Sequence, residues 1–172
     1  DLETLRSLGL SIAPEELADP TSNLLNSIVH LEFCSGSFIS PDGLIITNWH
    51  CVEGMLNYLT NDDRSKGISG TNFVKNGFIS KNRSEERSVG TTQRILITSG
   101  FKDVTAEVLA GVSEIADPAL RLKAIDKKVY ELVKAAEEGR PNIKVDLKSF
   151  YRGTKYYLIE RLELKDIRMV FA

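Results

Sequence analysis

The segment from residue 28 to residue 51 constrains the fold most, because two β-prone runs in it flank a strong turn signal. Residues 28–33 and 38–40, before the turn, are rich in β-branched and aromatic side chains. Residues 44–47, after the turn, form a short apolar run. Between them, Pro41-Asp42-Gly43 combines a fixed φ, a side chain that bonds to nearby backbone, and a residue free to take a positive φ. The segment therefore predicts a β-hairpin that turns at this tripeptide.

The second strand of this hairpin is expected to end at Asn48-Trp49-His50-Cys51, which places a histidine at a strand end. A histidine that acts as a base must lie near a nucleophile, in one tautomer, on a rigid element. A disulfide from Cys51 back to Cys34 would clamp the turn that carries His50 and would be worth about 3 kcal/mol in the chain-entropy model. The residue types alone leave two interpretations open: a bridged pair beside a catalytic histidine, or two free thiols beside an inert one.

Charge and hydropathy argue against two broad classes of function. The 172 residues include 22 basic and 24 acidic side chains, a net charge of -2, so we expect no nucleic-acid partner. No apolar run approaches the roughly 18 residues of a membrane-spanning helix, and no signal-peptide pattern opens the chain. Phosphate-binding loops, dinucleotide-binding glycine patterns and paired cysteines at zinc-site spacing are also missing, so we expect no cofactor and no metal.

The rest of the sequence is typical of an α+β fold that is mainly β. Residues 1–27 are interpreted as a helical lead-in, with leucines at helical spacing. The clearest helix is expected near residues 118–138, with Asp117 as its N-cap and Pro118 in its first turn. Its expected buried stripe consists of Leu122, Ile125, Val129, Leu132, Val133 and Ala136.

The remaining segments are expected to be a polar loop and further strands. Residues 60–92 are interpreted as surface loop with short ordered pieces around residues 73–74 and 78–79, and the charged run at residues 81–87 as a solvated part of it. Strands are expected at residues 94–98, 156–159 and 167–171. Together with the hairpin, these strands make a sheet the expected centre of the fold.

Four further polar side chains are weighed as candidates for chemistry. His30 lies in an alternating strand, where a structural role is favoured over that of a ligand. Asp103 and Asp166 are available carboxylates, and Asp103 follows a strand from which it could orient His50, but a solvated turn acid is the preferred interpretation. Ser37 is an available hydroxyl, and a structural role is preferred there over that of a nucleophile.

Residues 36–51 read Gly-Ser-Phe-Ile-Ser-Pro-Asp-Gly-Leu-Ile-Ile-Thr-Asn-Trp-His-Cys. This run resembles peptidase family S46, the exported dipeptidyl-peptidases 7 and 11, whose members usually show Gly-Ser-Phe-Val-Ser-Pro-Asp-Gly-Leu-Ile-x-Thr-Asn-His-His-Cys. Further segments similar to the family lie at residues 76–78, 83–86, 103–109, 149–153 and 166–172. The resemblance therefore extends over nearly the whole chain.

The resemblance implies a fold, a site and a location. His50 would be the triad histidine of a serine peptidase, and Cys34 and Cys51 would form the disulfide that flanks it. The fold would be a trypsin-like double β-barrel, of which residues 28–172 supply part of the first barrel with an inserted helix, as a single amino-terminal portion of the catalytic domain. The enzyme would release dipeptides from peptide amino termini in the periplasm or outside the cell, where disulfides persist.

Two departures from the family pattern affect this expectation. Trp49 replaces the usual first histidine of the His-His-Cys motif, which predicts altered packing and not lost chemistry. The family's triad aspartate follows the segment similar to residues 166–172, and its serine and oxyanion-hole glycines come later still. Since the 172 residues contain no Gly-Asp-Ser-Gly or Gly-x-Ser-x-Gly sequence, we expect the chain alone to be inactive.

The expected partners follow from that incompleteness. They are the remainder of the peptidase, in the same or a separate chain, and a peptide substrate; a homodimer is compatible with the family. Two other interpretations stay open. One is a non-catalytic binding or structural module derived from a truncated peptidase, and the other is an α+β domain with an inert histidine.

Overall fold

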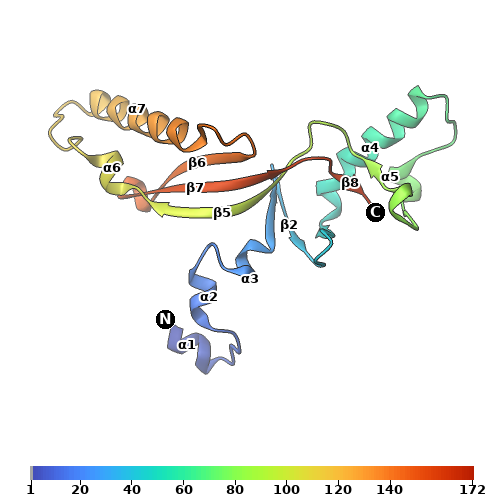
Figure 1. Ribbon diagram of the computed structural model, residues 1–172, viewed down its shortest axis with the longest axis horizontal. Coiled ribbons are helices and arrows are strands. Elements are labelled where there is room, and N and C mark those ends of the chain that lie inside the picture. The colour runs from blue at the N-terminus through green and yellow to red at the C-terminus, as the bar shows by residue number, and fades with distance from the viewer. Residues whose placement is uncertain (1) are drawn as a thin grey trace. The chain divides into compact units, whose positions relative to one another are not determined.

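The computed structural model describes residues 2–172, and the chain divides into two compact units (Figure 1). Unit 1 comprises the residues up to Asn26 together with Thr98–Leu162, and unit 2 comprises Ser27–Ile97 together with Glu163–Ala172. Each unit therefore joins segments that are far apart in the sequence, and strands β5 (Ile95–Asp103) and β7 (Lys155–Leu164) contribute residues to both.

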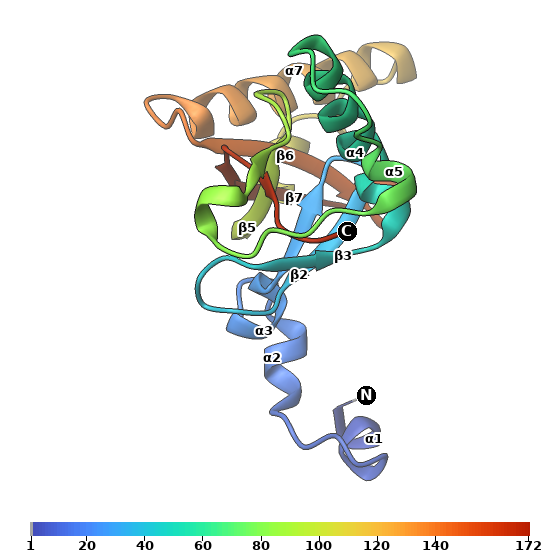
Figure 2. The ribbon, with the colours of Figure 1, turned by 90° about the vertical axis from the view of Figure 1, so that its right-hand side faces the viewer.

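The predicted hairpin is confirmed as part of an antiparallel meander in unit 2 (Figure 2). Its strands are β1 (Ile28–Leu31), β2 (Cys34–Phe38) and β3 (Ile45–Thr47). At the turn, the N–H of Ile39 donates to the carbonyl of Leu44 over 2.9 Å, and Gly43 takes a φ of 87° that favours glycine. Val29 and Leu31 point into the core from β1, whereas Ile28 and His30 alternate with them toward solvent.

Helix α4 (Trp49–Ser65) begins directly after β3, where a strand end and then a polar loop were expected. Both the strand end and the start of the loop are therefore wrong, since residues 49–65 form a helix. Leu56 and Leu59 are fully buried, because α4 presents an apolar face that packs against the buried residues Val89 and Met169. The polar residues that suggested a loop occupy the end of α4, where most of them face solvent.

Short elements complete unit 2. They are α5 (Phe73–Asn76), η1 (Arg83–Glu85), β4 (Arg87–Ser88) and β8 (Arg168–Met169). The strand expected at residues 167–171 is shorter than predicted: β8 pairs with β4, and Phe171 then forms an isolated bridge with Ile79. The strand expected at residues 94–98 is confirmed and continues to Asp103 as β5.

Unit 1 is built from short helices, one long helix and a long hairpin. The helices are α1 (Leu2–Ser7), α2 (Pro14–Ala18), α3 (Asn23–Asn26), α6 (Thr105–Leu109) and α7 (Pro118–Glu137). The hairpin pairs β6 (Ile143–Phe150) with β7, and η2 (Tyr151–Gly153) connects them. The helical lead-in and the strand expected at residues 156–159 are thus both confirmed.

Helix α7 is also confirmed, with one correction to its buried face. The Asp117 carboxylate accepts from the backbone N–H groups of Ala119 and Leu120, as an N-cap does. Five of the six residues of the predicted stripe pack against the core of unit 1, but Leu122 is 59% exposed. The packed face therefore starts one turn later than the periodicity indicated.

Over the described residues, six strands form an antiparallel sheet in the order β3-β2-β1-β5-β7-β6, and β4 and β8 form a two-stranded one. The α+β class expected from the sequence is therefore observed, but the expectation that the fold is mainly β is wrong, because more of the described residues lie in α-helices than in strands. Strand β3, which precedes the histidine-bearing helix, lies at an edge of the larger sheet. Within residues 2–172, no helix combines the length and apolar character needed to cross a lipid bilayer.

A candidate active-site histidine beside a disulfide

A disulfide ties the start of helix α4 to strand β2. Cys34 is the first residue of β2, Cys51 is the third residue of α4, and the structure joins them with their Cα atoms 5.9 Å apart. Cys34 is 9% exposed and Cys51 3%, and both belong to the core cluster that includes Val29, Leu31 and Ile95. The pairing is the one that the family resemblance implies, and it anchors the helix start to the sheet.

His50 is the second residue of α4 and is exposed to solvent. An imidazole nitrogen of His50 and the two sulfurs of the disulfide all lie within 4.8 Å of one another. The sequence analysis placed His50 at the end of a strand, but the histidine lies in the first turn of the helix that follows that strand. A helix start that is covalently tied to a buried strand is a rigid support, which is what a positioned base requires.

The first turn of α4 begins without a side-chain cap. Asn48, at the N-cap position, has extended φ and ψ and makes no capping hydrogen bond with its side chain. Its carbonyl accepts from the backbone N–H of Cys51 over 3.0 Å, so the bridged cysteine closes the first turn. The disulfide therefore supplies at this helix start the anchoring that a side-chain cap supplies elsewhere.

The far end of α4 is held by an ion pair that the sequence analysis missed. The guanidinium of Arg87, on β4, donates to the buried carboxylate of Asp63 over 2.6 Å and to Asp62 over 3.3 Å. The hydrogen bond to Asp63 raises the pKa of Arg87, and the guanidinium also lies 5.8 Å from the ring centroid of Phe73. The expectation of a fully solvated charged run at residues 81–87 is therefore wrong at Arg87.

The two alternative carboxylates are engaged locally. Asp103 accepts from the backbone N–H of Thr105 over 2.9 Å and from Nζ of Lys155 over 3.0 Å. Hydrogen bonds from Thr105, and then from Lys155, lower the pKa of Asp103 to about 2. Asp166 accepts from Arg168 over 2.8 Å, and this hydrogen bond lowers its pKa too. Asp103 fits the preferred interpretation of a turn acid, and Asp166 is paired with a neighbouring arginine.

The other two polar candidates lie on the meander. The Ser37 hydroxyl donates to the carbonyl of Phe38 over 3.2 Å, which fits a structural role. His30 is exposed on β1, opposite Ser35 on one side and Leu96 on the other. His30 is thus an exposed strand residue that can serve as a matched control for His50.

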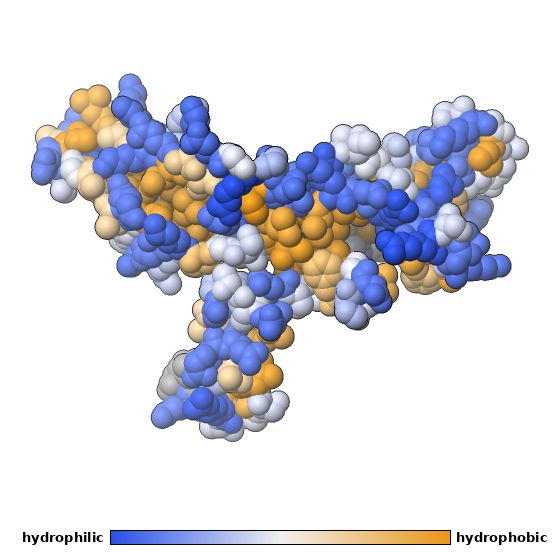
Figure 3. Space-filling model, in the orientation of Figure 1, coloured by the Kyte–Doolittle hydropathy of each residue, from blue (hydrophilic) through white to orange (hydrophobic). Residues whose placement is uncertain are grey.

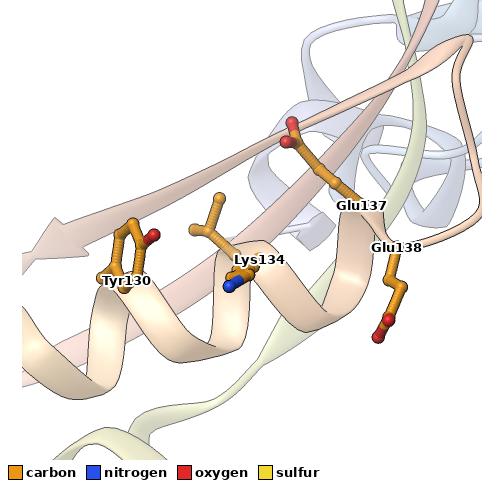
Figure 4. Close-up of a pocket in the computed structure, with 5 residues that line it drawn as sticks. Tyr130, Lys134, Glu137 and Glu138 are labelled. Carbon is orange, nitrogen blue, oxygen red and sulfur yellow. The ribbon is translucent and has the colours of Figure 1, made fainter.

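A hollow on helix α7 offers no comparable chemistry (Figure 4). It is lined by Tyr130, Val133, Lys134, Glu137 and Glu138. Glu137 turns toward strand β6, where its carboxylate accepts from the backbone N–H of Val145 over 2.9 Å. That side chain therefore helps to dock α7, and the five lining residues include no histidine, serine or cysteine.

Comparisons with known proteins place the chain in a peptidase family. Residues 1–172, the whole chain, match the model of a peptidase family. That family is Peptidase S46, and the chain belongs to it.

Individual relatives agree with this assignment. The chain is 35% identical to an Asp/Glu-specific dipeptidyl-peptidase of Shewanella putrefaciens over 170 residues, which cover 99% of this chain and 22% of that protein. It is 29% identical to dipeptidyl-peptidase 7 of Capnocytophaga gingivalis over 168 residues, 96% of this chain and 22% of the relative. The crystal structure of Porphyromonas endodontalis DPP11 in complex with substrate matches with a TM-score of 0.75 and 26% identity, over 99% of this chain and 25% of that one.

The chain thus spans about a quarter or less of the length of the relatives that it matches. The sequence and the structure describe a partial peptidase region. The expectation of an S46 peptidase region is confirmed, whereas the catalytic role of His50 stays a prediction.

Proposed function

We propose that this chain is the amino-terminal part of a serine dipeptidyl-peptidase and that His50 is its general base. The observation that carries the proposal is the position of His50: it is exposed in the first turn of α4, beside the disulfide that ties this turn to β2. The whole-chain match to the S46 family supplies the reaction class.

The proposed chemistry is acyl transfer. His50 takes the proton of a serine hydroxyl supplied by the remainder of the peptidase, and the serine oxygen attacks the carbonyl carbon of the second peptide bond. The protonated imidazole then gives its proton to the leaving amine, and a dipeptidyl ester remains on the serine. Water, activated by the same imidazole, releases the dipeptide and restores the serine. The relatives that match this chain include both an Asp/Glu-specific dipeptidyl-peptidase and a dipeptidyl-peptidase 7, so the proposal covers dipeptide release and not a side-chain preference.

The proposed architecture is part of the first barrel of a trypsin-like double barrel, which the remainder of the peptidase completes. Strand β3 is an edge of the six-stranded sheet, and its last residue precedes His50 by three positions. A strand that adds to β3 would therefore run beside the start of α4 and could bring an aspartate to His50. Apolar side chains are also exposed around β2 (Figure 3), where Ile28 and Ile46 on the neighbouring strands are 51% and 58% exposed. Such a surface agrees with the proposal that further polypeptide packs against this part of the sheet.

The proposed location and partners follow the same reasoning. A disulfide persists in an oxidising compartment, which supports an exported protein in the periplasm or outside the cell. The partners would be the remainder of the peptidase and a peptide substrate, and a homodimer is compatible with the family. The second candidate is a non-catalytic module derived from a truncated peptidase, which the free edge of β3 favours because an open edge can bind another chain.

Turnover of fluorogenic dipeptidyl amides by the full-length protein tests the proposal. His50→Gln should lower kcat by at least about 10⁴-fold, because the base is lost while the fold remains. His30→Gln, on the exposed face of β1, is the matched control and should retain wild-type activity. The 172-residue chain alone should show no turnover. Equal activity of His50→Gln and wild type would refute the assignment, and a full-length protein without peptidase activity would favour the module.

A further inference from the structure

We infer that Cys34, His50 and Cys51 form a zinc site when their disulfide is reduced. These three residues are of types that bind metal ions, and among the described residues they form the group whose possible ligand atoms lie close together. One imidazole nitrogen and the two sulfurs are all within 4.8 Å of one another. This inference goes beyond the proposed function, because it concerns the reduced chain and does not depend on catalysis.

The donor set suits zinc. Two thiolates and one imidazole nitrogen are ligands that Zn²⁺ prefers, and three protein ligands with one open position are typical of accessible zinc sites. His50 is exposed, so the open position can be filled by water. Cys34 and Cys51 belong to a buried core cluster, which keeps the two sulfurs in a defined place.

The geometry needs only a small adjustment. In a tetrahedral site, Zn–S distances of about 2.3 Å and Zn–N distances of about 2.0 Å place the donor atoms about 3.4–3.8 Å apart. Without the covalent bond, two sulfurs separate to about this spacing, and the Cα distance of 5.9 Å between Cys34 and Cys51 needs no backbone movement for it. The His50 nitrogen then has to approach by roughly 1 Å, within the reach of a χ rotation of an exposed side chain.

The disulfide and the metal exclude each other. A dithiol reductant transfers two electrons and two protons to the Cys34–Cys51 bond and is itself oxidised to a disulfide, which leaves two thiols on this chain. Zn²⁺ then displaces the two thiol protons and takes a lone pair from the neutral imidazole. In the oxidised chain the sulfurs are not thiolates, so the zinc site is lost.

This exclusion gives the site a consequence for His50. Zinc withdraws the imidazole lone pair that a general base needs, so the reduced, zinc-bound chain has a masked histidine. Thiol–disulfide exchange with a small-molecule disulfide, which is reduced to two thiols, re-forms the Cys34–Cys51 bond, expels the metal and frees the ring. Zinc also replaces the bridge between β2 and α4, so the helix start stays anchored in a reducing environment.

The test uses the 172-residue chain reduced with a phosphine, which takes its oxygen from water as it converts the disulfide into two thiols. After removal of unbound metal, elemental analysis should find one Zn²⁺ per reduced chain and none in the oxidised chain. Co²⁺ in place of Zn²⁺ should show thiolate-to-metal charge-transfer bands and the strong visible bands of a tetrahedral site. Zinc affinity should fall at least about tenfold in His50→Gln, since a ligand is lost, and stay unchanged in His30→Gln.

Two results would overturn the inference: a reduced chain that binds no zinc, or a His50→Gln variant that binds it as tightly as wild type. A measurement on the unsubstituted protein guards against variants that fail to fold. Zinc should raise the melting temperature of the reduced chain and leave that of the oxidised chain unchanged, and an equal effect on both would contradict the site. Because catalysis is tested with the oxidised full-length protein, failure here and failure of the proposed function are distinguishable.

Discussion

The two long helices of this chain differ in how the sequence encodes them. Helix α7 has 20 residues, none of them buried, and its start is defined by Asp117 and Pro118. Helix α4 has 17 residues, six of them buried, and its start has no capping hydrogen bond from a side chain. Helix α7 follows from local signals, whereas α4 depends on a disulfide at one end and the Arg87–Asp63 ion pair at the other.

The helix that is easier to predict from the sequence is therefore not the helix that carries the candidate catalytic residue. The helix that was predicted from the sequence carries a hollow lined by no histidine, serine or cysteine, whereas the helix that was not predicted carries His50. A helix built on long-range contacts can position a side chain against other elements, because its own placement is determined by them. The comparison predicts that α4 responds more strongly than α7 to the loss of tertiary contacts, and that α7 also responds to the loss of its cap.

The largest expected effect is on the core face of α4. Leu56→Ala removes a fully buried side chain, and we expect a loss of about 3 kcal/mol in the free energy of unfolding. Leu122→Ala in α7 is the matched control, since Leu122 is 59% exposed, and should change stability by less than about 0.5 kcal/mol. Urea unfolding followed by circular dichroism measures both. Similar losses for the two variants would contradict the conclusion that the buried face of α4 stabilises the fold.

The disulfide should come next in size. Replacing both Cys34 and Cys51 by serine should cost about 3 kcal/mol or somewhat less, because an unfolded chain without the bridge has more conformations. Hydrogen exchange read by mass spectrometry should show faster exchange in the first turns of α4 and unchanged exchange in α7. If α7 lost protection to the same degree, the helices would not be independent in the way proposed.

The N-cap of α7 should have a smaller effect. Asp117→Ala removes the acceptor for the N–H groups of Ala119 and Leu120, and we expect a loss of about 1 kcal/mol. Asp117→Asn keeps an acceptor oxygen and should retain most of that stability. The exchange rates of the first turn of α7 report the change, and unaffected rates in Asp117→Ala would mean that the packed face alone determines the helix.

The smallest effect should appear as a pH dependence in unit 1. Because the folded-state pKa of Asp103 is lowered to about 2, its carboxylate stabilises the fold above its usual pKa of about 3.9 and loses this contribution as the pH falls toward 2. Asp103→Asn should flatten the acid side of the stability profile in that range. Lys155→Met keeps the hydrogen bonds from Thr105, the larger cause of the shift, and should flatten it less. A profile unchanged in both variants would show that the exposed carboxylate contributes nothing measurable.

Much of the candidate site could be predicted from the sequence, but its immediate structure could not. The Pro41-Asp42-Gly43 turn and the strands around it were correct, because turn chemistry and short apolar runs act locally. The predicted secondary structure around His50 was wrong. The helix was missed because the polar residues of its last turn, which follow its apolar face, are typical of a loop. The buried partner of Arg87 could not be found either, since 24 residues separate it from Asp63.

The features that need only neighbouring residues could be predicted from the sequence: the hairpin turn, the capped helix α7, the lack of a membrane-spanning helix within residues 2–172, and the motif that is similar to the S46 family. The tertiary structure alone decided that His50 lies in a helix, that this helix is tied to β2 and β4, and that β3 is left at an edge of the sheet. The physical reason is the range of the interactions. Turns and caps are formed within a few residues, whereas a buried ion pair, a disulfide and a sheet order exist only after distant segments have packed.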